Sequence, residues 1–88
     1  MALNYNEYKK IQQECLILSQ KKNADYGSDN LKRFGKQGII IRMSDKMDRL
    51  ITLMQRDALI KDESIEDTAK DMINYAAYLI MLSRGRLE

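Results

Sequence analysis

The sequence predicts an all-α protein: a small helical bundle of three main helices and one long loop, completed by oligomerisation. Three observations predict it. The chain has no proline and only four glycines, so little in it interrupts helices. Apolar residues recur with the 3.6-residue period of an amphipathic helix in three separate segments. At 88 residues the chain is expected to form a single domain, residues 1–88.

The first helix is expected from about Asn6 to about Lys22, where apolar residues keep helical spacing. Asn4 or Asn6 is the expected N-cap, since an amide oxygen satisfies a free backbone N–H of the first turn. Residues 23–38, NADYGSDNLKRFGKQG, hold three of the four glycines and predict the long loop, with one helical turn around Leu31 to Phe34. So long a loop in so small a domain suggests a functional role.

The second helix is expected to begin near Ile39 or Ile40 and to run to about Asp57. Its core side is predicted from the apolar spacing. The residues expected on that side are Ile40, Met43, Met47, Leu50, Ile51 and Met54.

The third helix is expected to begin near Ser64, because Ser64 and Asp67 form an S-x-x-D capping pattern. It should continue to about Arg84 and stop at Gly85. Three helices with apolar faces this wide do not close a bundle by themselves. We therefore expect a homodimer or homotetramer.

Composition removes several classes of function. A net charge of +2 is too small to indicate a nucleic-acid partner, and no apolar run has the length of a membrane span. The single cysteine, Cys15, fits a reducing compartment, so we expect a cytoplasmic protein with no membrane partner. With no histidine and one cysteine, zinc sites and Ser-His or Cys-His nucleophile pairs are excluded. Any metal must be held by carboxylates, which favours Mg²⁺, with Mn²⁺ as the other choice.

The acidic stretch ESIEDTAKDMINY, residues 63–75, raises the question of a metal site. The helix dipole explains Glu66 and Asp67 in a first turn, but Asp71 lies beyond its reach and stacks above Asp67. A cation would offset that repulsion. The alternative is an ordinary solvated face, on which a helical wheel places Glu63, Asp67, Asp71, Asn74 and Tyr78 opposite the apolar arc.

A basic face on the second helix strengthens the metal interpretation. Arg42, Lys46 and Arg49 share that face with Asp45, and Asp48 lies at its edge. Opposite the acidic face, the three bases would bind phosphate and Asp45 would add a metal ligand. The alternative is a solvated face stabilised by an Asp45–Arg49 pair.

The loop adds K-N-x-D-Y-G, which begins at Lys22 and contains Asn23, Asp25 and Tyr26. Together with R-x-x-D-K-x-x-R-L (42–50) and E-S-x-x-D-T-x-x-D-x-x-N-Y (63–75), it resembles the phage and bacterial family called nucleotide modification associated domain 1. That group is similar to the MazG-like all-α nucleoside triphosphate pyrophosphohydrolases. The match covers residues 22–84.

The resemblance implies a MazG-like, Mg²⁺-dependent hydrolase that converts a (deoxy)nucleoside triphosphate to the monophosphate and pyrophosphate. The residues expected to act are, for metal binding, Asp45, Asp48, Asp67 and Asp71; for substrate binding, Lys22, Asn23, Asp25, Tyr26, Arg42, Arg49 and Asn74; and for catalysis, Glu63, Glu66 and Lys46. Glu63 and Glu66 are candidates for the general base, and Glu63 is a further candidate metal ligand.

The sequence departs from the MazG-like pattern, in which the first helix carries E-E-x-x-E and the next E-x-x-D. Here the first motif is reduced to Asp45 and Asp48, and Thr68 stands where the second has its glutamate. This departure supports an alternative function, a non-catalytic binder of a nucleotide or nucleotide signal. A third hypothesis is a helical protein–protein or DNA-associated module with merely solvated charged faces.

Overall fold

The computed structural model describes residues 2–55 and 61–87; for residues 61–63 it describes the backbone alone. The described chain forms four helices and no strand, which confirms the all-α prediction. In chain order they are α1 (Tyr5–Tyr26), α2 (Asp29–Arg33), α3 (Gly35–Met54) and α4 (Lys61–Ser83).

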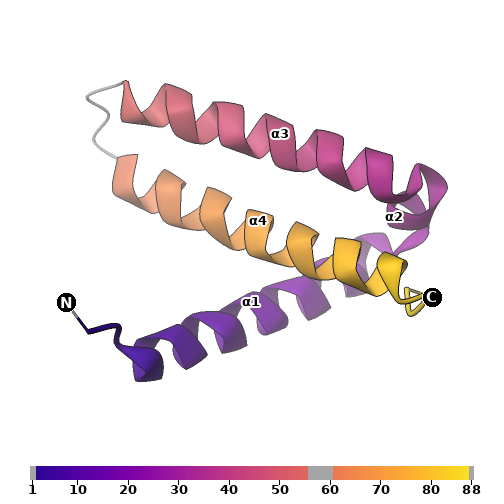
Figure 1. Cartoon of the computed structure of the whole chain (residues 1–88), viewed down its shortest axis with the longest axis horizontal. Coiled ribbons are helices and arrows are strands. Elements are labelled where there is room, and N and C mark those ends of the chain that lie inside the picture. The colour runs from indigo at the N-terminus through magenta and orange to yellow at the C-terminus, as the bar shows by residue number, and fades with distance from the viewer. Residues whose placement is uncertain (1, 56–60, 88) are drawn as a thin grey trace.

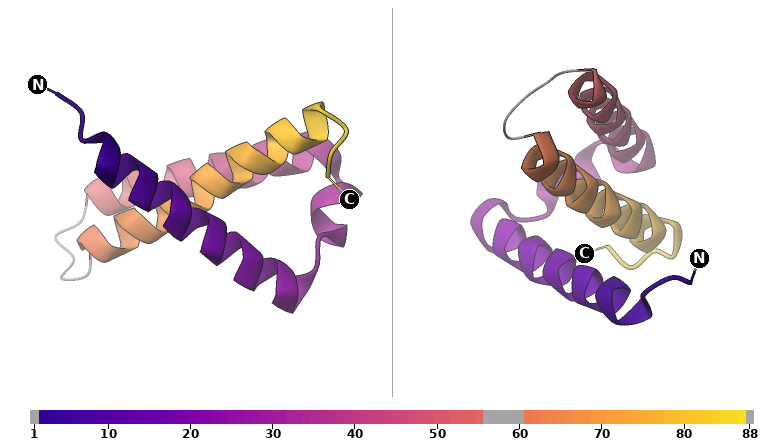
Figure 2. Two further views of the ribbon diagram at one scale, coloured as in Figure 1. Left: turned by 90° about the horizontal axis from the view of Figure 1, so that it is seen from below. Right: turned by 90° about the vertical axis from the view of Figure 1, so that its left-hand side faces the viewer.

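Helix α4 is the central element. It lies antiparallel beside α3, and α1 crosses its other side obliquely (Figures 1 and 2). The short helix α2 turns the chain from the end of α1 into α3 (Figure 1). None of the helices in the described part of the chain has the length and apolar character of a membrane span.

Helix α1 begins and ends on identifiable signals. The Asn4 side chain accepts a hydrogen bond from the backbone N–H of Glu7 at 3.1 Å, which settles the choice between the two predicted N-caps. The helix continues four residues beyond the predicted end at Lys22 and stops at Gly27, whose φ of 70° is costly for any residue with a Cβ.

The predicted loop over residues 23–38 is wrong. Most of it is helical, and α2 overlaps the expected helical turn but ends at Arg33, one residue before Phe34. Helix α3 begins at Gly35, before the predicted start at Ile39 or Ile40, and Gly38 lies inside it. A Cβ at Gly38 would lie 2.5 Å from the Cβ of Phe34, so this glycine allows a close contact and does not end a helix. The predicted end near Asp57 lies outside the described residues.

The ends of α4 differ in how well the sequence predicts them. Ser64 lies inside the helix, where its carbonyl accepts a hydrogen bond from the Thr68 hydroxyl, so the predicted cap is wrong. At the other end Gly85 terminates the helix as predicted. The backbone N–H of Gly85 donates to Leu82, and that of Arg86 donates to Met81, the pair of bonds that defines a Schellman motif.

Few side chains in the single chain are fully buried. Among the described residues the apolar ones are Cys15 of α1 and Ile39 of α3, and the polar ones are Thr68 and Asn74 of α4. Burial raises the pKa of the Cys15 thiol. Much of the predicted core side of α3 is exposed; the residues concerned are Ile40, Met47, Ile51 and Met54. Met43 and Leu50 of that side are half-buried, so the packed strip of α3 lies at one edge of the predicted core side, next to Ile39.

Candidate functional site

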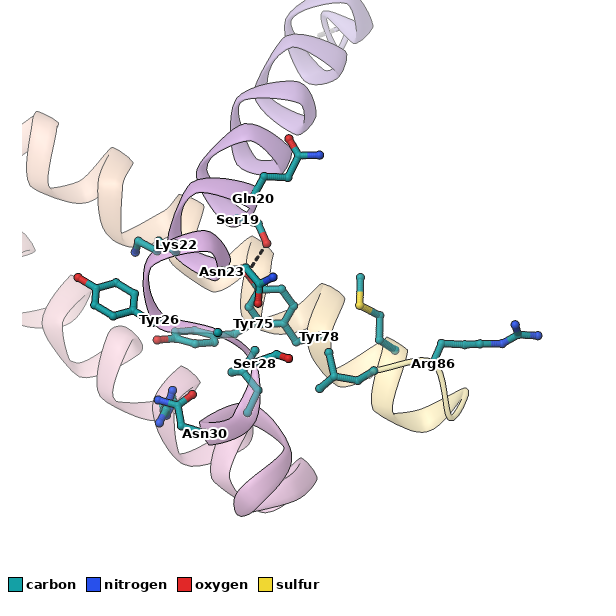
Figure 3. Close-up of a pocket in the computed structure, with 15 residues that line it drawn as sticks. Ser19, Gln20, Lys22, Asn23, Tyr26, Ser28, Asn30, Tyr75, Tyr78 and Arg86 are labelled. Atoms are coloured by element: carbon teal, nitrogen blue, oxygen red, sulfur yellow. Dashed lines mark hydrogen bonds between the residues drawn. The ribbon is translucent and has the colours of Figure 1, made fainter.

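A hollow of about 560 Å³ lies where the end of α1 and helix α2 approach the C-terminal half of α4 (Figure 3). This volume is typical of small-molecule sites. Its lining is mainly polar and aromatic: Ser19, Gln20, Lys22, Asn23, Tyr26, Gly27, Ser28, Asn30, Leu31, Arg42, Tyr75, Tyr78, Met81, Arg86 and Leu87.

Tyrosines of α4 form one wall of this first hollow. The rings of Tyr75 and Tyr78 meet edge to face, with centroids 6.3 Å apart and planes at 79°. The hydroxyl groups of Tyr78 and Ser19 share a hydrogen bond that joins α4 to α1 (Figure 3). The wall is therefore held in place from both helices.

A second hollow, of about 400 Å³, lies along α3. Its lining residues are Arg42, Asp45, Lys46, Arg49 and Tyr75. The first four recur at helical spacing, so they share one face of α3. Its lining holds three cations and one carboxylate, so the lining carries net positive charge.

Arg42 and Tyr75 line both hollows. The two spaces therefore lie next to each other; the first is aromatic and amide-rich and the second is basic. Arg42 is half-buried, which limits the motion of its guanidinium group more than at a fully exposed position.

Asp71 joins the three long helices next to this site. One of its oxygens accepts a hydrogen bond from Lys22 Nζ of α1 at 2.8 Å, and the other lies 3.1 Å from Lys46 Nζ of α3. Burial favours a higher pKa for Asp71, but the two lysines together outweigh it and hold the pKa below its ordinary value. The hydrogen bond to Asp71 in turn raises the pKa of Lys22.

A second group of ion pairs links α1 to α4 along the helices. Lys70 Nζ lies 3.3 Å from Glu66, one helical turn away, and 3.4 Å from Glu14 of α1. The hydrogen bond from Lys70 to Glu66 is the main cause of the raised pKa of Lys70. Glu66, a candidate general base, is thus paired with a lysine and lines neither hollow.

Comparisons with protein-family models, with curated proteins and with solved structures identify no relative of this chain. No match is found. The resemblance to the nucleotide modification associated domain 1 and MazG-like families stays a prediction.

The structure brings most of the predicted substrate-binding residues together. Lys22, Asn23 and Tyr26 line the first hollow, Arg49 lines the second, and Arg42 lines both. Lys46, predicted to be catalytic, also lines the second hollow.

Two predicted substrate-binding residues lie elsewhere. Asp25 is exposed near the end of α1 and lines neither hollow. Asn74 is buried in α4, since this helix packs on two sides and its polar face is not an outer surface. The interpretation of that face as simply solvated is wrong for Asn74 and for the half-buried Asp71.

The predicted metal ligands are less well gathered. Within residues 2–55 and 64–87, no group of three or more carboxylate or thiol side chains is suited to hold a metal ion. Asp48 and Asp67 are exposed on different helices, and both oxygens of Asp71 contact lysines. The side chain of Glu63 lies outside the described residues. In the described part of one chain the donors do not fit Mg²⁺, and the magnesium site stays a prediction.

Tyr75 is the main site residue without a predicted role. It follows Asp71 by one helical turn and forms part of the wall shared by the two hollows. That spacing was a usable signal, because a side chain one turn from a site residue lies on the same face of the helix. Ser19 and Asn30 gave no such signal.

Proposed function

We propose that this protein binds a (deoxy)nucleoside triphosphate across the two adjoining hollows. The observation that carries the proposal is the shared wall of Arg42 and Tyr75, which joins an aromatic, amide-rich space to a basic one. A nucleotide has the same division, with a flat base at one end and a polyanion at the other.

The basic hollow suits the phosphates. Arg42, Lys46 and Arg49 present three cations from one face of α3, where Asp45 lines the same hollow and Asp71 pairs with Lys46 from beside it, so the cations stay in excess. Guanidinium groups bind phosphate oxygens through two parallel hydrogen bonds, and a positive concave surface attracts anions from a distance.

The aromatic hollow suits the base. Tyr26 and Tyr75 supply ring faces for stacking, which is favourable for any base. Asn23 and Asn30 supply amide donors and acceptors for the base edge or the sugar. This division also accounts for the predicted roles of Asn23 and Tyr26.

The test is calorimetric titration of the protein with the four ribonucleoside and four deoxyribonucleoside triphosphates, with EDTA or with Mg²⁺. Arg49→Gln should lower the affinity for the tightest-binding nucleotide about tenfold, which is the usual effect of losing a charge-assisted hydrogen bond. Lys10→Gln is the matched control, since Lys10 is exposed on α1 and lines neither hollow. Failure of folded protein to bind any of the eight would overturn the proposal.

Hydrolysis of the bound nucleotide to monophosphate and pyrophosphate is the second candidate. Asp45 favours it, because this carboxylate lines the phosphate-binding hollow. The same eight nucleotides are incubated with the protein and Mg²⁺ or Mn²⁺, and pyrophosphate is measured. Binding without release assigns the protein as a nucleotide binder, whereas release assigns it as a pyrophosphohydrolase.

We further propose a homodimer or homotetramer as the working state. The chain exposes 7179 Å², whereas a compact monomer of 10.3 kDa exposes about 5,400 Å². Its radius of gyration of 14.4 Å also exceeds the value of about 12 Å for a compact domain of this length. A second copy against the exposed apolar residues of α3 would cover part of this excess surface.

A further inference from the structure

The two hollows are linked in a second way, through Asp71. The first hollow contributes Lys22 and the second contributes Lys46, and both ammonium groups contact this one carboxylate. Asp71 itself lines neither hollow. The lysine side chains are 49% and 29% exposed and the aspartate side chain 18%, so a ligand reaches the lysines more easily than their partner.

In this arrangement the Asp71 carboxylate lies where a bound anion would lie, between the two lysines. Asp71 presents two oxygens to two cations from different helices, as a phosphate group would. Because both ammonium groups contact the same carboxylate, they are close enough for one di- or triphosphate to reach both. A lysine ammonium has three N–H donors, but the ion pair directs part of that capacity to Asp71.

We propose that Asp71 is an internal competitor of the ligand: it occupies Lys22 and Lys46 in the free protein, and the ligand's phosphates take them over on binding. The inference rests on the proposed function, since it presumes a polyphosphate ligand. It makes Asp71 a residue that weakens phosphate binding. A residue that held a metal ion against the phosphates would have the opposite effect and would strengthen phosphate binding.

The test is calorimetric titration with inorganic tripolyphosphate in EDTA, which separates the phosphate contacts from the base and from any metal. Asp71→Asn keeps the shape of the side chain and removes its charge. We expect it to bind tripolyphosphate about tenfold more tightly than the unaltered protein, because two partly exposed ion pairs no longer have to break.

Asp45→Asn is the matched control. Asp45 lines the basic hollow, and the described residues include no ion pair to it, so this variant makes the same change in charge without freeing a lysine. A general electrostatic effect would raise the affinity in both variants alike. The proposal requires the gain in Asp71→Asn to exceed that in Asp45→Asn by at least threefold.

A measurement on the unaltered protein covers the case in which Asp71→Asn does not fold. The ¹³C resonance of the Asp71 carboxylate should shift when tripolyphosphate saturates the protein at pH 7, and the Asp67 resonance should not. An unmoved Asp71 resonance in saturated protein would contradict the proposal.

The tripolyphosphate titrations distinguish failure of the competitor role of Asp71 from failure of nucleotide binding. Equal gains in the two variants, or weaker binding by Asp71→Asn, would overturn the competitor role and leave nucleotide binding in place. If neither the unaltered protein nor Asp71→Asn binds tripolyphosphate, the phosphate part of the proposed function fails as well.

Discussion

At the scale of single residues, Asp71 joins more of the fold than its size suggests. It is a half-buried carboxylate on the central helix, and its ion pairs reach both neighbouring helices. A buried charge is tolerated only with partners, so the two lysines and Asp71 depend on one another. Their contribution to stability must therefore vary with pH in a defined way.

The first prediction concerns that pH dependence. The pKa of Asp71 is lower in the folded chain than its ordinary 3.8, so its contribution is present above that pH and is lost as the pH falls through the folded value. The pKa of Lys22 is raised above 10.5, so its contribution is present below that pH and is lost as the pH rises through the folded value.

Urea denaturation of the unaltered protein and of Asp71→Asn measures this effect. Asp71→Asn should lower the free energy of unfolding by about 1 kcal/mol at pH 7, with the difference shrinking at both pH extremes. Asp67→Asn is the control, since Asp67 is exposed and should show little change. A difference that is absent at pH 7, or that grows in acid, would contradict the prediction.

The sequence predicted the basic side of the site better than the acidic side. The helical spacing of Arg42, Lys46 and Arg49 places them on one face whatever α3 packs against. The role of Asp71 depends on which helix is central, and one sequence does not contain that information. A helical wheel of α4 could therefore show that Asp71 shares a face with Asp67, but not that lysines of α1 and α3 would reach it.

At the scale of the elements, local signals predicted some helix ends correctly, at Asn4 and Gly85, and failed at others, at Ser64 and Gly38. The N-cap at Asn4 and the C-terminal turn at Gly85 follow from chemistry within a few residues. The loop prediction is wrong because only Gly27 of its three glycines ends a helix, whereas Gly35 and Gly38 lie within α3. One of them, Gly38, instead accommodates the Phe34 side chain in the first turns of α3.

The second prediction tests the cap of α1. Asn4→Ala removes the oxygen that accepts the N–H of Glu7 and should lower the free energy of unfolding by about 1 kcal/mol. Asn6→Ala is the matched control, because Asn6 is exposed inside the helix, where alanine is the better helix former. Urea denaturation followed by circular dichroism should give Asn4→Ala a lower free energy of unfolding than the unaltered protein. Asn6→Ala should have a free energy of unfolding equal to or above that of the unaltered protein. Equal stability of the two variants would rule out this capping role.

At the scale of the whole molecule, the single chain is more open than its mass predicts. The long apolar side chains of α3 at Ile40, Met47, Ile51 and Met54 form an exposed stripe on the side away from the basic face. The excess surface of about 1,800 Å² per chain is enough for an obligate interface.

The third prediction concerns the oligomer. Light scattering after size exclusion should give a mass of at least twice 10.3 kDa. Ile51→Lys should shift the protein toward the monomer by placing a charge in the stripe, whereas Thr52→Lys adds the same charge at an exposed neighbour outside it. A monomer for the unaltered protein, with cooperative unfolding, would show that α3 needs no second copy.

The wall shared by the two hollows also limits how specificity can change. Any substitution at Arg42 or Tyr75 alters the shape of both hollows at once. A change at either residue therefore cannot alter the preference for one end of a ligand without affecting the other end. Substitutions at positions that line one hollow alone, such as Asn30 or Asp45, alter that hollow without changing the other. On the proposed nucleotide-binding function, a change of base preference should therefore begin at Asn30, and a change in the preferred anion length at Asp45.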